Sequence, residues 1–148
     1  MAMTRFYSID DANAALPDVQ RILENLRDQR DELIRLRDMV TAAQEGEPTS
    51  TKDRESPAPD GSGGTTTADI HTLRLRMQFL IDQMQAGVTR LVEQDVTLRE
   101  IGTGLIDFPA LVNGRQVWLC WRLGEGHIGW WHELGDGFAD RSRLADLT

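Results

Sequence analysis

The sequence predicts an α+β fold, with a long antiparallel helical hairpin followed by a small C-terminal three-stranded antiparallel β-meander. Two long segments, 8–43 and 68–102, space their apolar residues by three and four, which is the period of one helix face. A segment rich in Pro, Gly, Ser and Thr separates them at 44–67. Residues 105–133 hold short aromatic and β-branched runs divided by glycine-containing turns, which is typical of strands.

Length and composition indicate a soluble protein of one domain. A chain of 148 residues can bury a core of its own, so we expect a single domain over 1–148. The net charge of -8 argues against nucleic-acid binding, because like charges repel the phosphate backbone. Cys120 is the only cysteine, and no apolar run approaches the roughly 20 residues that span a bilayer. We therefore expect a cytoplasmic protein without membrane contact.

The first helix is expected to begin after Ser8, whose hydroxyl can accept a hydrogen bond from a first-turn N–H. Pro17 lies about two turns later and predicts a short helix, then a kink or a fresh start at that residue. The apolar stripe continues to Val40, and Arg30 and Arg37 occupy two of its positions. These arginines either lie at the edge of the stripe or face a second hairpin from another copy.

The segment 44–67 contains prolines, a glycine-rich run and no large apolar residue, so we expect a disordered linker. The second helix is predicted over 68–102, because its three-four spacing runs without a break. Gly87 leaves a gap in that stripe, where a backbone can approach or a large side chain can insert. Gly102 and Gly104 are expected to end the helix.

The predicted meander begins after these glycines. Asn113-Gly114 is a strong signal for a two-residue hairpin turn, and a glycine-rich turn follows at 124–126. A sheet of this size needs a partner layer, so it should pack on the helices. The tail over 134–148 can fold back through Phe138 and Leu144. The three strands are expected at 105–112, 116–122 and 127–133.

Alternation along the strands divides the four tryptophans between the two faces of the sheet. Trp121 and Trp131 are expected to face the helical core. The other face has two open interpretations: the tail and Arg122 half-cover it, or it is an aromatic platform for a partner. The residues of that outer face are Trp118, Cys120, Arg122, Trp130 and His132.

A possible reactive cluster lies on the same outer face. Cys120 and His132 could converge there as two soft ligands for a transition metal, but no Cys-x-x-Cys or His-x-x-x-His spacing supplies further ligands. The sequence therefore favours the alternative, a buried structural cysteine beside a hydrogen-bonded histidine. Catalysis would need Asp107 and Glu133 as paired carboxylates, or Cys120 and His132 as nucleophile and base. No oxyanion hole or phosphate loop accompanies them. Asp107 alternatively forms a turn or pairs with Arg122 across strands.

Four segments carry a resemblance to a known family. They are Ala-Asn-Ala-Ala-Leu-Pro at 12–17, Gly-Leu-Ile-Asp-Phe-Pro-Ala at 104–110, Val-Trp-Leu-Cys-Trp-Arg-Leu-Gly-Glu at 117–125 and Ile-Gly-Trp-Trp-His-Glu at 128–133. With them the chain resembles the prokaryotic domain of unknown function 2203, and the linker looks like an insertion. The resemblance implies a self-contained domain and assigns no catalytic residue.

These observations favour a non-catalytic protein-interaction module that self-associates through its helical hairpin and the Trp/Arg-rich sheet face. No cofactor is expected, and the partner is a second copy or another protein. The alternative is a small metal- or ligand-binding protein, or an enzyme, centred on Cys120, His132 and Asp107. The residues assigned to partner binding are Trp118, Arg122, Trp130, Arg30 and Arg37.

Overall fold

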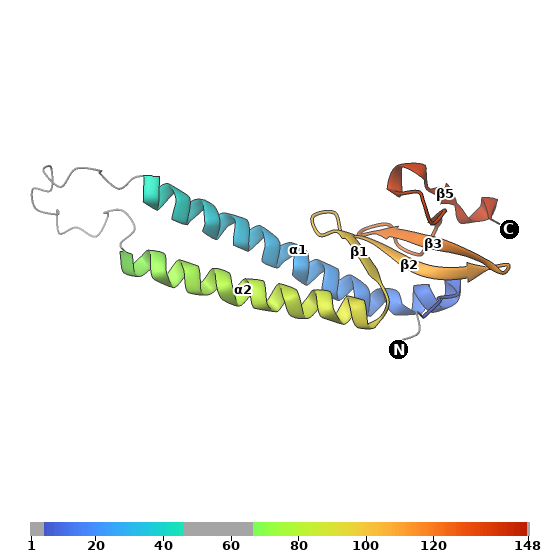
Figure 1. The fold of residues 1–148 in the computed structure, drawn as a ribbon, viewed down its shortest axis with the longest axis horizontal. Coiled ribbons are helices and arrows are strands. Elements are labelled where there is room, and N and C mark those ends of the chain that lie inside the picture. The colour runs from blue at the N-terminus through green and yellow to red at the C-terminus, as the bar shows by residue number, and fades with distance from the viewer. Residues whose placement is uncertain (1–4, 46–66, 148) are drawn as a thin grey trace, which may run out of the picture.

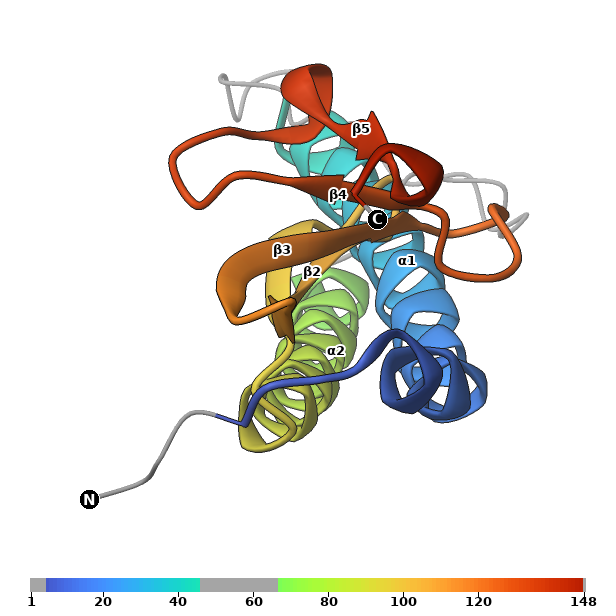
Figure 2. The ribbon, with the colours of Figure 1, turned by 90° about the vertical axis from the view of Figure 1, so that its right-hand side faces the viewer.

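The computed structural model describes residues 5–45 and 67–147, so most of the predicted linker lies outside the described residues. Two long helices form a hairpin, and a five-stranded antiparallel sheet lies against one end of it (Figures 1 and 2). The α+β class and the helical hairpin are therefore confirmed. The helices are α1 (Ile9–Glu45) and α2 (Thr67–Glu93), and the strands, in spatial order, are β1 (Thr97–Glu100), β2 (Leu105–Val112), β3 (Arg115–Arg122), β4 (Trp130–His132) and β5 (Ser142–Arg143).

Helix α1 begins where the sequence predicts. The Ser8 hydroxyl accepts a hydrogen bond of 3.0 Å from the Asp11 N–H and so caps the first turn. The expected restart at Pro17 is wrong, because α1 runs through this residue as one helix. Pro17 is exposed, whereas Leu16 and Val19 on either side of it are buried. Packing of the flanking turns therefore maintains the helix across the missing N–H.

Helix α2 ends at Glu93, not at 102 as the periodicity predicted. Asp95 adopts the left-handed conformation (φ 59°), and the next N–H, that of Val96, donates to the Leu91 carbonyl over 3.0 Å. Residues 97–100 then pair with β2 as strand β1. Gly104 does not end the helix: with φ 66° it lies in the turn between β1 and β2.

The gap at Gly87 is filled from α1, as one of the two expected outcomes. A Cβ at Gly87 would lie 3.0 Å from Leu26 Cδ2 and 3.7 Å from Ile22 Cγ2. The absence of a side chain therefore lets Leu26 insert against α2 at the level of the sheet.

The predicted three-stranded meander is present as β2, β3 and β4, and β1 and β5 extend it at both edges. Asn113 and Gly114 form the first turn with φ 55° and 77°, as a primed hairpin turn requires. The tail folds back over the outer face through a 3₁₀ turn at Phe138–Asp140, strand β5 and a second 3₁₀ turn at Leu144–Asp146. Leu144 packs against the core, as expected.

The core lies between the hairpin and the inner face of the sheet. Trp121 is buried there and Trp131 is partly buried against the same cluster, so the inner pair of tryptophans is confirmed. Tyr7 belongs to this core and was missed by the sequence analysis. Its N–H donates to the Pro109 carbonyl (2.7 Å), and its hydroxyl donates to the Gln94 carbonyl just after α2 (2.6 Å). The N-terminal segment thus joins the sheet to the end of α2.

The sheet covers only one end of the hairpin. Figure 1 shows it over the N-terminal half of α1 and the C-terminal end of α2, while the other half of the hairpin projects away. In that projecting half the buried residues are few: Val40 on α1, and Ile70 and Leu80 on α2. The described helices there have no third layer, so much of their apolar surface stays open.

Candidate functional site

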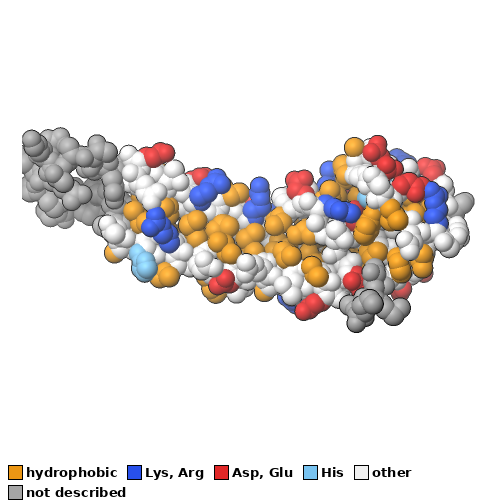
Figure 3. All heavy atoms as spheres, in the orientation of Figure 1, with side chains coloured by type: hydrophobic (Ala, Val, Ile, Leu, Met, Phe, Trp, Pro, Cys, Tyr) orange, Lys and Arg blue, Asp and Glu red, His pale blue; other side chains and the backbone are white. Residues whose placement is uncertain are grey.

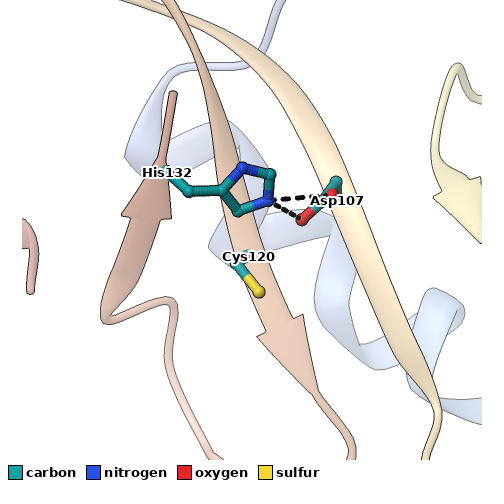
Figure 4. A group of neighbouring side chains, drawn as sticks. All are labelled: Asp107, Cys120 and His132. Atoms are coloured by element: carbon teal, nitrogen blue, oxygen red, sulfur yellow. Dashed lines mark hydrogen bonds and ion pairs between the residues drawn. The ribbon is translucent and has the colours of Figure 1, made fainter. Parts of the chain in front are cut away.

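Three adjacent strands bring Asp107, Cys120 and His132 together on the outer face of the sheet. Asp107 on β2 pairs with Cys120 on β3, and His132 on β4 pairs with Trp118, two residues before Cys120 on the same face of β3. All three residues are buried, and their ligand-type atoms lie within 4.8 Å of one another (Figure 4). The predicted convergence of Cys120 and His132 on one face agrees with this arrangement.

His132 uses both ring nitrogens inside the protein. Its Nε2 lies 3.0 Å from both carboxylate oxygens of Asp107, and its Nδ1 lies 2.9 Å from the Glu133 carbonyl oxygen. A carbonyl oxygen only accepts, so Nδ1 is the donor there. The contact between Nε2 and the Asp107 carboxylate then requires a proton or another cation between the two groups. With its side chain 1% exposed, His132 offers no free nitrogen as a general base.

Arg99 on β1 is the second partner of Asp107. Its Nε donates to Asp107 Oδ2 over 2.8 Å, and its guanidinium lies 5.1 Å from the centre of the Trp118 ring. Asp107 is therefore a strand residue and not a turn former, and its cationic partner is not Arg122. The sequence analysis missed this pair because it assigned Arg99 to a helix.

Cys120 is buried and holds a neutral thiol near neutral pH. Burial raises its pKa from the ordinary 9.0 to about 11, and the Asp107 carboxylate acts in the same direction. Arg141 Nη1, 4.0 Å from the sulfur, opposes this shift. A thiol of this kind is a weak nucleophile, so the arrangement does not favour cysteine catalysis.

The tail covers part of the outer tryptophan face. Arg141 forms two bonds to Glu125 (2.6 and 3.0 Å), and its guanidinium lies 4.3 Å from the Trp130 ring centre and 4.1 Å from that of Phe138. Burial acts to raise the pKa of Glu125, but its bonds to Arg141 and to the Arg122 N–H lower it overall. Trp130 is thus half-covered by arginine from the tail, as one of the two interpretations expected.

Glu133 does not join Asp107 as a paired carboxylate. Its side chain forms an ion pair with Arg115 at the start of β3. The two-carboxylate hypothesis is therefore not supported by the positions of these side chains.

A pocket of about 240 Å³ lies between this cluster and the tail. The cluster residues form one wall, and residues that follow β4 form the opposite wall. The lining consists of Arg99, Leu105, Asp107, Cys120 and His132 on the sheet side, and Leu134, Asp136, Gly137 and Phe138 on the tail side.

A second surface runs from the hairpin to the edge of the sheet. A hollow of about 520 Å³ lies between the helices, and one of about 500 Å³ lies between α2 and β1; Val88 lines both. Figure 3 shows hydrophobic side chains along this face of the hairpin. We call this surface the apolar band; it comprises Leu33, Ile81, Met84, Val88, Val92, Leu98 and Trp118.

Arg30 and Arg37 lie on the exposed surface of α1. Each has an acidic partner one residue later, Asp31 at 3.6 Å and Asp38 at 3.2 Å. Arg30 also lies close to the turn at Gly102. These contacts agree with the edge position that was one of the two expectations.

The family comparison agrees with the resemblance in the sequence. A family model described as "Uncharacterized conserved protein (DUF2203)" matches residues 5–144. No curated protein and no solved structure is detectably similar to the chain. Neither helix of the described ranges is long and apolar enough to cross a membrane.

Proposed function

The chain belongs to the DUF2203 family of uncharacterized conserved proteins, and we propose that it is a non-catalytic interaction module that self-associates through the apolar band. The observation that carries this proposal is the open apolar surface that continues from the groove between the two helices to the edge of the sheet. Val92 belongs to this surface and is 63% exposed, although the neighbouring Leu91 on the same helix is buried. Contiguous apolar surface of this kind marks interaction sites in soluble proteins.

A second copy of the chain is the partner that fits the shape of the band. The band combines a groove, lined by Leu33, Ile81 and Met84, with an exposed apolar side chain, that of Val92. A two-fold axis would place Val92 of each copy in the groove of the other, so the contact forms twice. A stable dimer buries about 800 Å² per partner, which favours a surface that spans both hairpin and sheet edge.

The predicted partner-binding residues divide into two groups in this proposal. Trp118 lines the hollow at the sheet edge and belongs to the band. Arg30 and Arg37 line neither hollow, so we do not assign them to the band. Trp130 and Arg122 contact the tail through Arg141 and Phe138, so we assign them to the fold of the outer face.

The geometry of the polar cluster supports a non-catalytic assignment. His132 has an acceptor at each ring nitrogen, and Cys120 is a buried neutral thiol. Acid–base or nucleophilic catalysis would require one of these groups to leave its present partner.

Light scattering coupled to gel filtration, over a range of concentrations, tests the proposal. We expect a dimer for the native chain, and Val88→Glu or Val92→Glu should weaken it at least about tenfold, because a charge would enter an apolar contact. Leu75→Glu is the matched control: Leu75 is 58% exposed on the same helix but does not line the band. A native chain that stays monomeric at high concentration would overturn the proposal. So would a Leu75→Glu variant that dissociates as readily as Val92→Glu.

A further inference from the structure

The buried cluster on the outer sheet face presents three different kinds of ligand atom to one point. Asp107 offers a carboxylate oxygen, Cys120 a sulfur and His132 an imidazole nitrogen, and these atoms lie within 4.8 Å of one another (Figure 4). Tetrahedral zinc, with bonds of about 2.0–2.3 Å, sets its ligand atoms roughly 3.3–3.8 Å apart. Small side-chain rotations would therefore close the present set around one ion.

The orientation of His132 is that of a metal ligand. Metal-binding histidines usually donate their other ring N–H to a carbonyl or carboxylate, which fixes the tautomer. Here Nδ1 donates to the Glu133 carbonyl, so in the neutral ring the lone pair of Nε2 faces both oxygens of Asp107 at 3.0 Å. Lone pairs at that distance repel unless a cation lies between them. A proton or a metal ion fills this requirement.

The surrounding arginines fit the same arrangement. Arg99 bonds Asp107 Oδ2 at 2.8 Å, which orients the carboxylate in the way that outer partners orient metal ligands. Arg141 lies 4.0 Å from the Cys120 sulfur, while Glu125 balances its charge. The ligand set would carry two negative charges once Cys120 is a thiolate, which matches a divalent cation.

We propose that Asp107, Cys120 and His132 bind a zinc-type divalent transition-metal ion, with its fourth position open toward the pocket beneath the tail. In zinc sites with three protein ligands, a water molecule or another bound molecule takes the fourth position. Mixed sulfur, nitrogen and oxygen ligands favour zinc and cobalt over magnesium or calcium. Binding would release the Cys120 thiol proton and the proton between His132 and Asp107 to solvent. The three proposed ligands line neither hollow of the apolar band, so a failure of the metal proposal can be distinguished from a failure of the self-association proposal.

Cobalt titration of the metal-stripped full chain tests the site. Cys120 is the only cysteine, so a thiolate-to-cobalt charge-transfer band in the near ultraviolet would report on it alone. We expect this band to saturate at one equivalent of Co²⁺ and to disappear when Zn²⁺ is added. Cys120→Ser, Asp107→Asn and His132→Gln should each weaken binding by about 100-fold or more.

Two further measurements separate metal binding from loss of fold. His127→Gln is the control, because His127 is exposed and outside the cluster, and it should titrate like the native chain. Far-UV circular dichroism identifies any variant that does not fold, and Cys120→Ser, the most conservative change, then decides the result. No charge-transfer band in the native chain at saturating Co²⁺ would overturn the proposal. A folded Cys120→Ser variant with native zinc affinity would do the same.

Discussion

Replacing Asp107 with asparagine tests whether the buried cluster of the outer sheet face acts as one unit. The variant keeps the size of the side chain but removes its charge. Asp107 accepts from Arg99 over 2.8 Å and lies 3.0 Å from His132 Nε2. Both partners therefore remain in place beside a neutral amide.

The expected cost follows from the burial of these two contacts. A hydrogen bond to a charged group contributes about 1.5–3 kcal/mol to stability. The Arg99 side chain is 42% exposed, so water replaces part of its bond, whereas the His132 side chain is 1% exposed. We expect Asp107→Asn to lower the free energy of unfolding by about 3 kcal/mol. Arg99→Ala should cost only about 1 kcal/mol, because Asp107 keeps His132.

Urea unfolding followed by tryptophan fluorescence measures these values, with a chelator present so that bound metal does not contribute. His132→Gln should cost about 2–3 kcal/mol. The double variant Asp107→Asn/His132→Gln should cost less than the two single variants together by about 1–3 kcal/mol, since the two amides can bond each other. Asp136→Asn, an exposed carboxylate at the same pocket, should stay within about 0.5 kcal/mol of the native chain.

Two results would refute this reasoning. Additive single and double variants, within about 0.5 kcal/mol, would mean that Asp107 and His132 do not interact energetically. An Asp107→Asn variant no less stable than Arg99→Ala would mean that the exposed ion pair, and not the buried contact, is the main interaction of Asp107.

Three further predictions concern the core and the thiol. Tyr7→Phe should cost about 1–2 kcal/mol in urea unfolding, because the backbone carbonyl after α2 loses its 2.6 Å hydroxyl donor; an unchanged midpoint would contradict this. Gly87→Val should cost about 1–3 kcal/mol more than Ala86→Val at the neighbouring exposed position, because a Cβ at Gly87 would lie 3.0 Å from Leu26 Cδ2; equal melting temperatures would contradict it. The pKa of Cys120 is raised from 9.0 to about 11, so folding favours the protonated thiol. As the pH rises from 9.0 to about 11 without metal, the free energy of unfolding of the native chain should fall by about 2 kcal/mol relative to that of Cys120→Ala. Parallel plots of the free energy of unfolding against pH for the two proteins would contradict this.

Much of the fold was predictable from local pattern. The three-four spacing of apolar residues identifies both helices, and Asn113-Gly114 identifies the first hairpin turn with its two positive φ angles. Alternation along β3 and β4 correctly assigns Trp121 and Trp131 to the core. These signals succeed because each depends on residues close together in the chain.

The remaining fold depends on contacts between distant residues. Leu98 and Ile101 keep the helical spacing and still pack against the core, but from β1 and the turn that follows it. Apolar spacing alone does not distinguish a longer helix from a helix followed by a strand. The change from helix to strand occurs at Asp95, which adopts the left-handed conformation. Tyr7 is buried because it contacts Pro109 and Gln94, about a hundred residues away. No short-range pattern reports such a contact.

Only the part of the candidate site that follows from the alternation of side chains along a strand was predictable. Period-two alternation placed Cys120 and His132 on one face, and the register of β2 against β3 brings Asp107 to the same place. The partner of Asp107 was missed because Arg99 comes from the mispredicted strand. The sequence analysis expected the tail to cover this face but did not identify Arg141 as the residue that covers Trp130. The tail sequence has no strong preference for helix or strand, so its path over the sheet could not be predicted.

Strand β1 connects the two surfaces for which we propose roles. Leu98 lines the hollow of the apolar band, and the next residue, Arg99, bonds Asp107 in the polar cluster. Arg99 also lies 5.1 Å from the ring centre of Trp118, which belongs to the band. A metal ion that pulls Asp107 toward Cys120 and His132 would change the bond that holds Arg99 over Trp118. Linkage between two binding events is reciprocal, so self-association would then change metal affinity by the same factor. Metal affinity that is the same below and above the dimer dissociation constant would show that β1 does not couple the two sites.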